Sequence, residues 1–466
     1  MEVPSVDYQM GGGGEQRLHE FFDRVGRALG NKRRRASFAM YAMGLLGEGE
    51  RKSMEPIAAR ACAAPDEVDA LHQRLGHFLT DSAWSDRSVR REAASYALSA
   101  MTAREPIEAW IVDDTGFLKQ GKHSVGVQRQ YTGSAGKVTN CQIGVSLSVS
   151  TRTEHLPIDF ELYLPRSWAE DSERRKEARI PSDVAFRKKP ELALNMIDRA
   201  IEERVPRGVV LADEGYGNSS DFRSEVRARG LDYGVAVNAN TAVWLVNRKG
   251  TLGRVKWGVR DLARRLGRRR FRRTTWREGS GGQLFARFAT RRVVVAHDDG
   301  SPPAEREPLW LLMEWREGEP GPAHFHLLTL PERTSRKRMV RLVKERYRTE
   351  RAYEDLKGEL GLDHFEGRRF PGWHHHVSVA LCCYAFITAE RVLAFPPSAG
   401  WKGRTGSHEV QAGTPLRGLL HYGPPCDCPC AQHVAPAMPG LSLHGEAAVL
   451  EDIAHSINPL PSEMTQ

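Results

Sequence analysis

The stretch that decides the fold runs from Glu108 to Phe117 and reads "EAWIVDDTGF". Its first half is a short apolar run typical of a buried strand, and the run ends in two acids, Asp113 and Asp114. Packing explains such acids poorly, because a buried carboxylate needs a partner or a metal ion. The stretch therefore predicts a strand that carries an acid to a functional site.

Further strands and helices follow in a definite order. Residues 140–150 and 156–165 alternate between apolar and polar as strands do. A helix near 190–203, a buried strand from Gly208, a helix over about 220–229 and a strand at 232–239 come next. This order predicts an α/β mixed sheet flanked by helices, with a meander first and crossover connections later.

The chain before this sheet has a helical pattern. After a flexible lead (1–15), apolar residues recur at helical spacing over 18–29, 37–47, 53–62, 66–79 and 86–101, which predicts an all-helical domain at 16–104. Asp66 is the expected N-cap of the fourth helix. The third and fourth helices are compatible with a DNA-binding helix-turn-helix, and an ordinary helical bundle is the equally weighted alternative.

The second half of the chain divides into three parts. Residues 241–333 contain strand-like pieces between Gly/Pro-rich links, which predicts a β-rich insertion. Helices are expected over about 335–361 and 373–393, so the core would comprise residues 105–240 and 334–396. Residues 397–466, including "CDCPC" at 426–430, are expected to form an irregular tail.

Composition limits the partners. The 466 residues include 68 Lys and Arg against 59 Asp and Glu, a net charge of +9, which makes an anionic partner such as nucleic acid plausible. The longest apolar run, which begins at Val377, is shorter than the roughly 18 residues of a membrane span. We therefore expect a soluble cytoplasmic protein without a membrane partner.

Two more acids stand out by their positions. Asp213 ends the strand "VVLAD", and Glu350 lies in the helical stretch "RYRTERAYEDLKGELG" that starts at Arg346. At about 100° per residue, Arg346, Glu350, Glu354 and Lys357 share one helix face. For an arbitrary helix, a solvated face with salt bridges would be the commoner explanation, but Asp113 and Asp213 at strand ends favour a functional face. Three such acids, however, suit two divalent ions about 4 Å apart that act on a phosphodiester, and Mg²⁺ prefers such oxygen ligands.

Several motifs together resemble a known family. "DDTGFLKQGKHSVGVQRQYTGSAGKVTNCQIGVSLS", "LYLPRSWAED", "LADEGYG" and "YEDLKGELGLDHFEGRRFPGWHHH" resemble insertion-sequence transposases of the DDE superfamily, in order, over about residues 18–395. The resemblance implies an RNase H-like catalytic core, a helical DNA-binding region, and a β insertion before the catalytic Glu.

The resemblance also implies roles for single residues. Asp113, Asp213 and Glu350 would be the catalytic acids that hold Mg²⁺, or Mn²⁺ in its place, with Asp114 as the alternative first acid. Arg346 and Lys357 match the Arg and Lys of a Tyr-Arg-Glu-Lys signature and would bind DNA phosphates. Val343 stands where the signature has Tyr, and Tyr347 or Arg348 is the expected substitute.

Other residues of interest lie outside the acids. In the insertion, the expected DNA-binding residues are Arg268, Arg269, Arg270, Arg272 and Trp276, because arginine with an aromatic neighbour suits backbone capture and base stacking. An exposed charged segment with Trp276 in a local core is the alternative. His374, His375 and His376 are consecutive, so on a helix they diverge and are expected to pack or to line DNA rather than to share a metal ion.

The sequence thus predicts a transposase that binds the terminal inverted repeats of its own element as double-stranded DNA, cleaves the ends, and transfers them to target DNA. Two ends must meet, so a homodimer on nucleoid DNA is expected. An inactive DNA-binding relic or regulator, and a metal-dependent nuclease without strand transfer, remain the rival interpretations.

Overall fold

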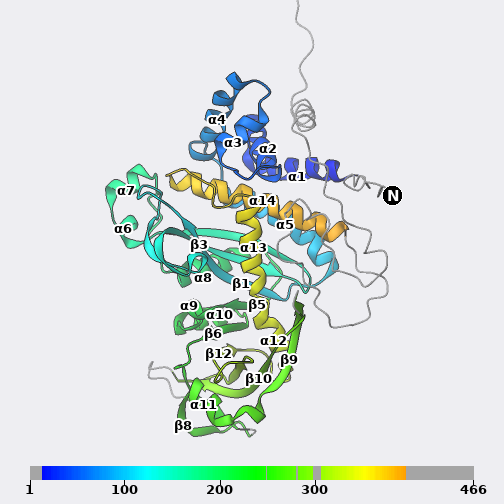
Figure 1. Ribbon diagram of the computed structural model, residues 1–466, viewed down its shortest axis with the longest axis vertical. Coiled ribbons are helices and arrows are strands. Elements are labelled where there is room, and N and C mark those ends of the chain that lie inside the picture. The colour runs from blue at the N-terminus through cyan, green and yellow to red at the C-terminus, as the bar shows by residue number, and fades with distance from the viewer. Residues whose placement is uncertain (1–12, 248, 280–281, 297–305, 395–466) are drawn as a thin grey trace, which may run out of the picture.

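The structure, a computed structural model, describes residues 13–247, 249–279, 282–296 and 306–394. Within these residues one twelve-stranded mixed sheet extends from the helical end of the molecule to its strand-rich end (Figure 1). The predicted tail (397–466) and most of the predicted lead lie outside the described residues. The predicted fold class, an RNase H-like mixed sheet with helices on its faces and a helical N-terminal region, is confirmed.

The N-terminal region is helical, as predicted. It contains α1 (Gly14–Leu29), α2 (Lys32–Leu46), α3 (Met54–Ala61), α4 (Pro65–Thr80) and α5 (Asp86–Arg104). Ser85 caps α5 by accepting a hydrogen bond from Ser88 N. Asp66 is not the N-cap of α4: the helix begins at Pro65, whose fixed φ suits the first helical position, and Asp66 lies in the first turn.

The central strands carry the expected order. β1 (Ala109–Leu118), β3 (Lys137–Ser150) and β4 (His155–Tyr163) are antiparallel neighbours, and a short β2 (Gln128–Thr132), which the sequence did not reveal, pairs with β3. Short helices α6 (Arg166–Ala169) and α7 (Ser172–Glu177) lead to α8 (Lys189–Glu202). The crossovers then give β5 (Val209–Ala212), α9 (Glu214–Gly217), α10 (Ser220–Ala228) and β6 (Tyr233–Val237). β1, β5 and β6 run parallel, as helical crossovers require.

The predicted insertion is rich in strands but is continuous with the central sheet. It contains β7 (Ala242–Val246), β8 (Leu252–Gly258), α11 (Val259–Leu266), β9 (Arg272–Gly279), β10 (Gly282–Val295), β11 (Leu309–Trp315) and β12 (His324–Leu328). β12 pairs with β6, so the sheet order is β2-β3-β1-β5-β6-β12-β11-β10-β7-β8. Sequence patterns identify strands but not their partners, so this continuity was not predicted.

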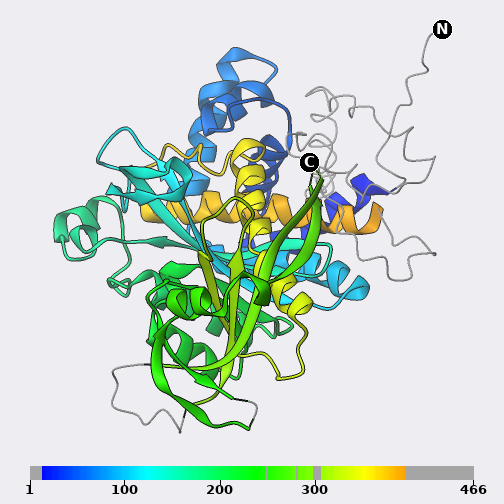
Figure 2. The same ribbon diagram turned by 60° about the horizontal axis from the view of Figure 1, so that its bottom comes forward.

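The long helix expected over 335–361 is two helices. α12 (Arg336–Lys344) ends at Glu345, and α13 (Tyr347–Gly358) starts in a new direction, upright in the centre of Figure 1. Hydrogen bonds of the tighter three-residue type, such as Arg348 N to Glu345 O, replace the regular helical pattern at the joint. The break lets α12 pack beside the β9–β10 hairpin, which is green in Figure 2, while α13 lies against β1 and β4.

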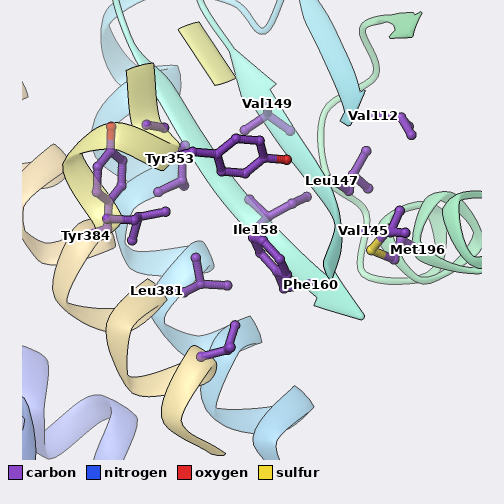
Figure 3. Packing of buried hydrophobic residues seen from close by; sticks show 14 of the residues in the cluster. Val112, Val145, Leu147, Val149, Ile158, Phe160, Met196, Tyr353, Leu381 and Tyr384 are labelled. Carbon is purple, nitrogen blue, oxygen red and sulfur yellow. The ribbon is translucent and has the colours of Figure 1, made fainter. Parts of the chain in front are cut away.

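The core joins the helical region to the sheet. Figure 3 shows Tyr353 of α13 directed toward apolar side chains of β3 and β4, and Tyr384 of α14 (Phe370–Ala394) standing beside α13. α14 also packs on α2, α4 and α5, so the N-terminal helices share its core. Among the described residues one helix, Phe370–Leu393, is apolar and long enough to cross a membrane, but 83% of its most apolar window is buried inside the protein. α14 is therefore a core helix of this fold.

The three consecutive histidines are buried in this core, which confirms that they pack. His375 stacks on Trp84, and its two ring nitrogens lie within hydrogen-bond distance of the carbonyl oxygens of Leu79 and Trp84. His376 Nε2 lies 3.1 Å from the carbonyl oxygens of Gly361 and Leu362, and its Nδ1 lies 2.8 Å from the hydroxyl of Tyr41. Nε2 faces two carbonyl oxygens and therefore donates, and the hydroxyl of Tyr41 can donate to Nδ1 of a neutral ring. Burial favours this neutral form of His376.

His376 should make the fold sensitive to acid. Burial lowers its pKa from 6.5 to about 4, so the unfolded chain takes up a proton before the folded one does. The contribution of neutral His376 to the free energy of unfolding is complete above about pH 6.5. It decreases by about 3 kcal/mol at most as the pH falls toward 4. His376→Gln is expected to be less stable at pH 7.5 but to lose less stability between pH 7.5 and 5. Urea unfolding at both pH values measures this, and His123→Gln, at an exposed site, should behave as the parent.

Candidate active site

Adjacent parallel strands place the first two acids side by side. β1 and β5 pair with Ile111 opposite Leu211, so Asp113 and Asp213 each follow two residues later at the same end of the sheet. β1 does not end at its two acids as predicted but continues to Leu118 along β3, so Asp113 lies within its strand whereas Asp213 follows the end of β5. Asp213 ends its strand as predicted, and its Oδ1 accepts a hydrogen bond of 2.8 Å from Gly215 N at the start of α9.

Helix α13 and its preceding residue bring the third acid and a cation to this edge. Arg346 Nη2 donates to Asp113 Oδ2 at 2.8 Å. Burial alone would lower the pKa of Arg346, but attraction to Asp113, Asp213 and Glu350 raises it overall. The charges of all three predicted acids therefore contribute to the raised pKa of Arg346, although the acids lie 100 and 137 positions apart in the chain (113 to 213 and 213 to 350).

Asp113 is the most buried of the three acids. Its exposed fraction is 7%, and its Oδ1 accepts a hydrogen bond from Asp114 N. Burial raises its pKa to about 6 in spite of the opposing attraction of Arg346, and the charge of Asp213 adds to the rise. Arg346 thus compensates the negative charge of Asp113 only in part. Further positive charge beside Asp113 would therefore be favourable.

Asp114 has different partners, as expected for successive residues of a strand. Its Oδ2 lies 3.1 Å from Lys189 Nζ at the start of α8 and accepts a hydrogen bond of 3.3 Å from the hydroxyl of Tyr216. Asp114 therefore ties β1 to α8 and α9. The geometry favours Asp113, rather than Asp114, as the acid that acts together with Asp213 and Glu350.

Comparisons with known proteins agree with this arrangement. Residues 20–283, more than half of the chain, match the family described as DDE superfamily endonuclease, and residues 188–386 match the family described as transposase DDE domain. The chain belongs to the DDE endonuclease superfamily. The two DDE matches together include Asp113, Asp213 and Glu350, and the resemblance to insertion-sequence transposases of this superfamily is confirmed.

This chain is also similar to a curated protein, the probable transposase for insertion sequence element IS701 of Microchaete diplosiphon. The two are 29% identical over 214 residues, which is 46% of this chain and 51% of the relative. The chain thus spans about half the length of the relative that it matches.

Lys357 holds the DDE site together from the last turn of α13. Its Nζ donates to Thr115 Oγ1 at 2.8 Å, to the carbonyl of Gly116 at 2.7 Å and to Ser134 Oγ at 3.2 Å. Burial lowers its pKa. Sequence reasoning selected Lys357 for phosphate contact but missed Thr115 and Ser134, and only the Thr of "DDT" gave a signal. The predicted phosphate contact stays a prediction.

Glu354, the competing acid on the predicted face, has its own partner. Its side chain is 65% exposed and pairs with Arg351. Arg348, one expected substitute for the signature Tyr, is committed elsewhere, because it donates to the carbonyls of Arg152 and Thr153 and pairs with Glu345. Tyr347, the other substitute, lies beneath the guanidinium of Arg277 at 3.8 Å. Val343, which lies in α12, is buried in the core.

The basic residues of the insertion lie on its surface. Arg268, Arg269 and Arg270 form an exposed turn after α11, and Arg272 is exposed at the start of β9. Trp276 is half-buried, packs edge-on against Phe288 and lies 4.5 Å from Lys344 Nζ. Trp276 therefore packs in a local core, as in the alternative interpretation. Contact of Trp276 and the four exposed arginines with DNA stays a prediction.

The three acids suit a divalent ion by the type of their donors. Asp113, Asp213 and Glu350 offer only carboxylate oxygens, the donors that Mg²⁺ prefers. Within the described chain, however, no three His, Cys, Asp or Glu side chains stand close enough to hold one ion together. Arg346, paired with Asp113, supplies positive charge there. The donor chemistry fits Mg²⁺, and binding would require the acids to close around the ion.

Proposed function

We propose that the protein is a DNA transposase that binds the terminal inverted repeats of an insertion sequence and catalyses metal-dependent cleavage and strand transfer. One observation carries the proposal: Asp113 and Asp213 lie side by side where β1 and β5 pair, and Arg346, four residues before Glu350, forms an ion pair with Asp113, in the chain order of a DDE core. The family matches support a nuclease or transposase, and the finer reaction rests on the site.

Asp113, Asp213 and Glu350 would hold Mg²⁺, with Mn²⁺ as the alternative ion. When bound, the ions supply activation of the attacking water or 3′ hydroxyl and stabilisation of the leaving oxygen. Arg346, already within 2.8 Å of Asp113, is placed to bind a phosphate oxygen once it leaves this carboxylate. Lys357 keeps α13 against Thr115 and Gly116, so Glu350 and Asp113 stay on facing elements.

The partner would be double-stranded DNA, first the transposon ends and then the target. The exposed arginines Arg268, Arg269, Arg270 and Arg272 suit backbone phosphates, and the helical region of α3 and α4 would recognise the ends. Because two ends must be joined to one target, the working form would be a homodimer on DNA. The reaction would take place in the cytoplasm, on nucleoid DNA.

The test is cleavage of the element's own ends. The protein is incubated with end-labelled duplexes that contain the DNA flanking its gene, with Mg²⁺, with Mn²⁺ or with EDTA, together with supercoiled plasmid as target. We expect nicks at the element boundary and joined products only where Mg²⁺ or Mn²⁺ is present.

The other outcomes distinguish the rivals. Binding of the ends without cleavage in either metal would identify a relic or regulator and would overturn the proposed activity. Cleavage at the boundary without joined plasmid would identify a nuclease without strand transfer. Equal cleavage in EDTA would overturn the role of the metal ions.

A further inference from the structure

The hairpin between β2 and β3 folds onto the active site. Its turn, residues Gly133–Ala135, lies against β1 directly after Asp113. Ser134 Oγ lies 3.1 Å from Thr115 Oγ1 and accepts from Gly116 N at 3.3 Å and from Lys357 Nζ at 3.2 Å. Gly116 is required here, because a Cβ at this position would overlap the side chain of Thr132. The hairpin tip is therefore fixed beside the catalytic acids.

Two large apolar side chains on this hairpin face solvent. Tyr131 is 63% exposed and Val138 is 54% exposed, and the two lie directly opposite each other in the β2–β3 ladder. Residues that face each other in such a ladder share one side of it, so Tyr131 and Val138 form one continuous surface. Ser134 follows Tyr131 by three positions, a reach of about 11 Å at most. The surface therefore lies close to the site.

The charge around this surface favours nucleic acid over protein. From Thr115 to Thr153 the chain contains five basic residues and no Asp or Glu. Arg129, two residues before Tyr131, is exposed on the same side of the ladder, and Lys137, next to Val138, is exposed at the turn end of β3. An aromatic ring beside cations that bind phosphates is the combination that proteins use to hold unpaired bases.

We infer that the β2–β3 hairpin is a DNA-binding element of the active site, in which Tyr131 stacks on a base unpaired near the cleaved phosphate and Val138 supports the ring. Arg129 and Lys137 bind the neighbouring phosphates. The inference rests on the proposed function for the position of the cleaved phosphate. It adds a binding residue that lies outside the acids and outside the basic insertion.

The experiment compares Tyr131→Ala and Tyr131→Phe with the full-length parent. The probes are two fluorescein-labelled duplexes of the element end, one fully paired and one with two unpaired bases at the boundary. We expect Tyr131→Ala to weaken binding of the unpaired probe by about tenfold, the effect of losing one stacked base, and the paired probe much less. Tyr131→Phe should bind as the parent, because it keeps the ring. Val255→Ala, at an exposed apolar site on the distant edge strand β8, is the matched control.

The outcomes separate this inference from the proposed function. If the parent binds the probes but never cleaves them, the proposed activity fails, while loss of binding in Tyr131→Ala still supports the hairpin contact. If Tyr131→Ala binds and cleaves as the parent does, the inference is wrong. If Tyr131→Ala instead changes the oligomeric state by light scattering and leaves DNA binding intact, the surface is a protein interface and the inference is equally overturned.

Discussion

Glu350→Gln should reduce cleavage of the element ends by at least about a thousandfold, and Glu354→Gln, one helical turn away, should leave it within about twofold of the parent. Glutamine keeps the size of the side chain but removes the negative charge that attracts Arg346 and would bind the metal ion. A loss of several kcal/mol of transition-state stabilisation corresponds to this factor. Glu354 can be neutralised with little effect because it is exposed and pairs only with Arg351 among the described contacts.

The two variants must be compared under identical conditions. Initial rates on the labelled duplex in Mg²⁺ measure cleavage, and binding of the same duplex in EDTA shows whether each variant still recognises DNA. Both residues lie at exposed positions on α13, so neither change should disturb the fold. Equal cleavage by Glu350→Gln and the parent would contradict the assignment of the third acid, and loss with Glu354→Gln alone would move that role to Glu354.

The sequence predicts that Asp113 and Asp213 lie together because local pattern and chain order carry this information. The apolar run before Asp113 is the first half of β1, and the run before Asp213 is the short strand β5. The two strands are parallel neighbours, so the acids that follow their paired segments lie side by side. Glu350 enters through the resemblance, since nothing local distinguishes it from Glu354 except its position four residues after Arg346.

What the sequence missed depends on contacts between distant segments. The continuation of the sheet from β6 to β12 joins residues about ninety positions apart, as in the pair Val237 and Phe325. The helix break at Glu345 follows from where α12 and α13 pack, and no proline or glycine marks it. Ser134 reaches Thr115 only because the β2–β3 hairpin bends back over β1. Periodicity describes single elements and cannot reveal such pairings.

Asp113→Asn should abolish cleavage, with a loss of at least about a thousandfold, and at the same time make the fold more stable. Asparagine has nearly the same shape but cannot supply the anionic oxygen that the metal ion needs. The effect on stability has the opposite sign because the carboxylate is buried and Arg346 compensates it only in part, which raises its pKa from 3.8 to about 6. A raised pKa means that the acid's favourable contribution is present below about pH 4 and is lost as the pH rises through 6.

The gain in stability of Asp113→Asn should therefore be small at pH 4 and should grow to about 3 kcal/mol at most by pH 8, as urea unfolding in EDTA would measure. Mg²⁺ should raise the stability of the parent at pH 8 but not that of the variant, since only the charged site binds the ion. Asp114→Asn is the matched control: it loses the pair with Lys189, so it should be slightly less stable yet still cleave DNA. If Asp113→Asn still cleaved DNA and Asp114→Asn did not, Asp114 would be the first catalytic acid. Only the carboxylate that binds the metal ions should be indispensable for cleavage.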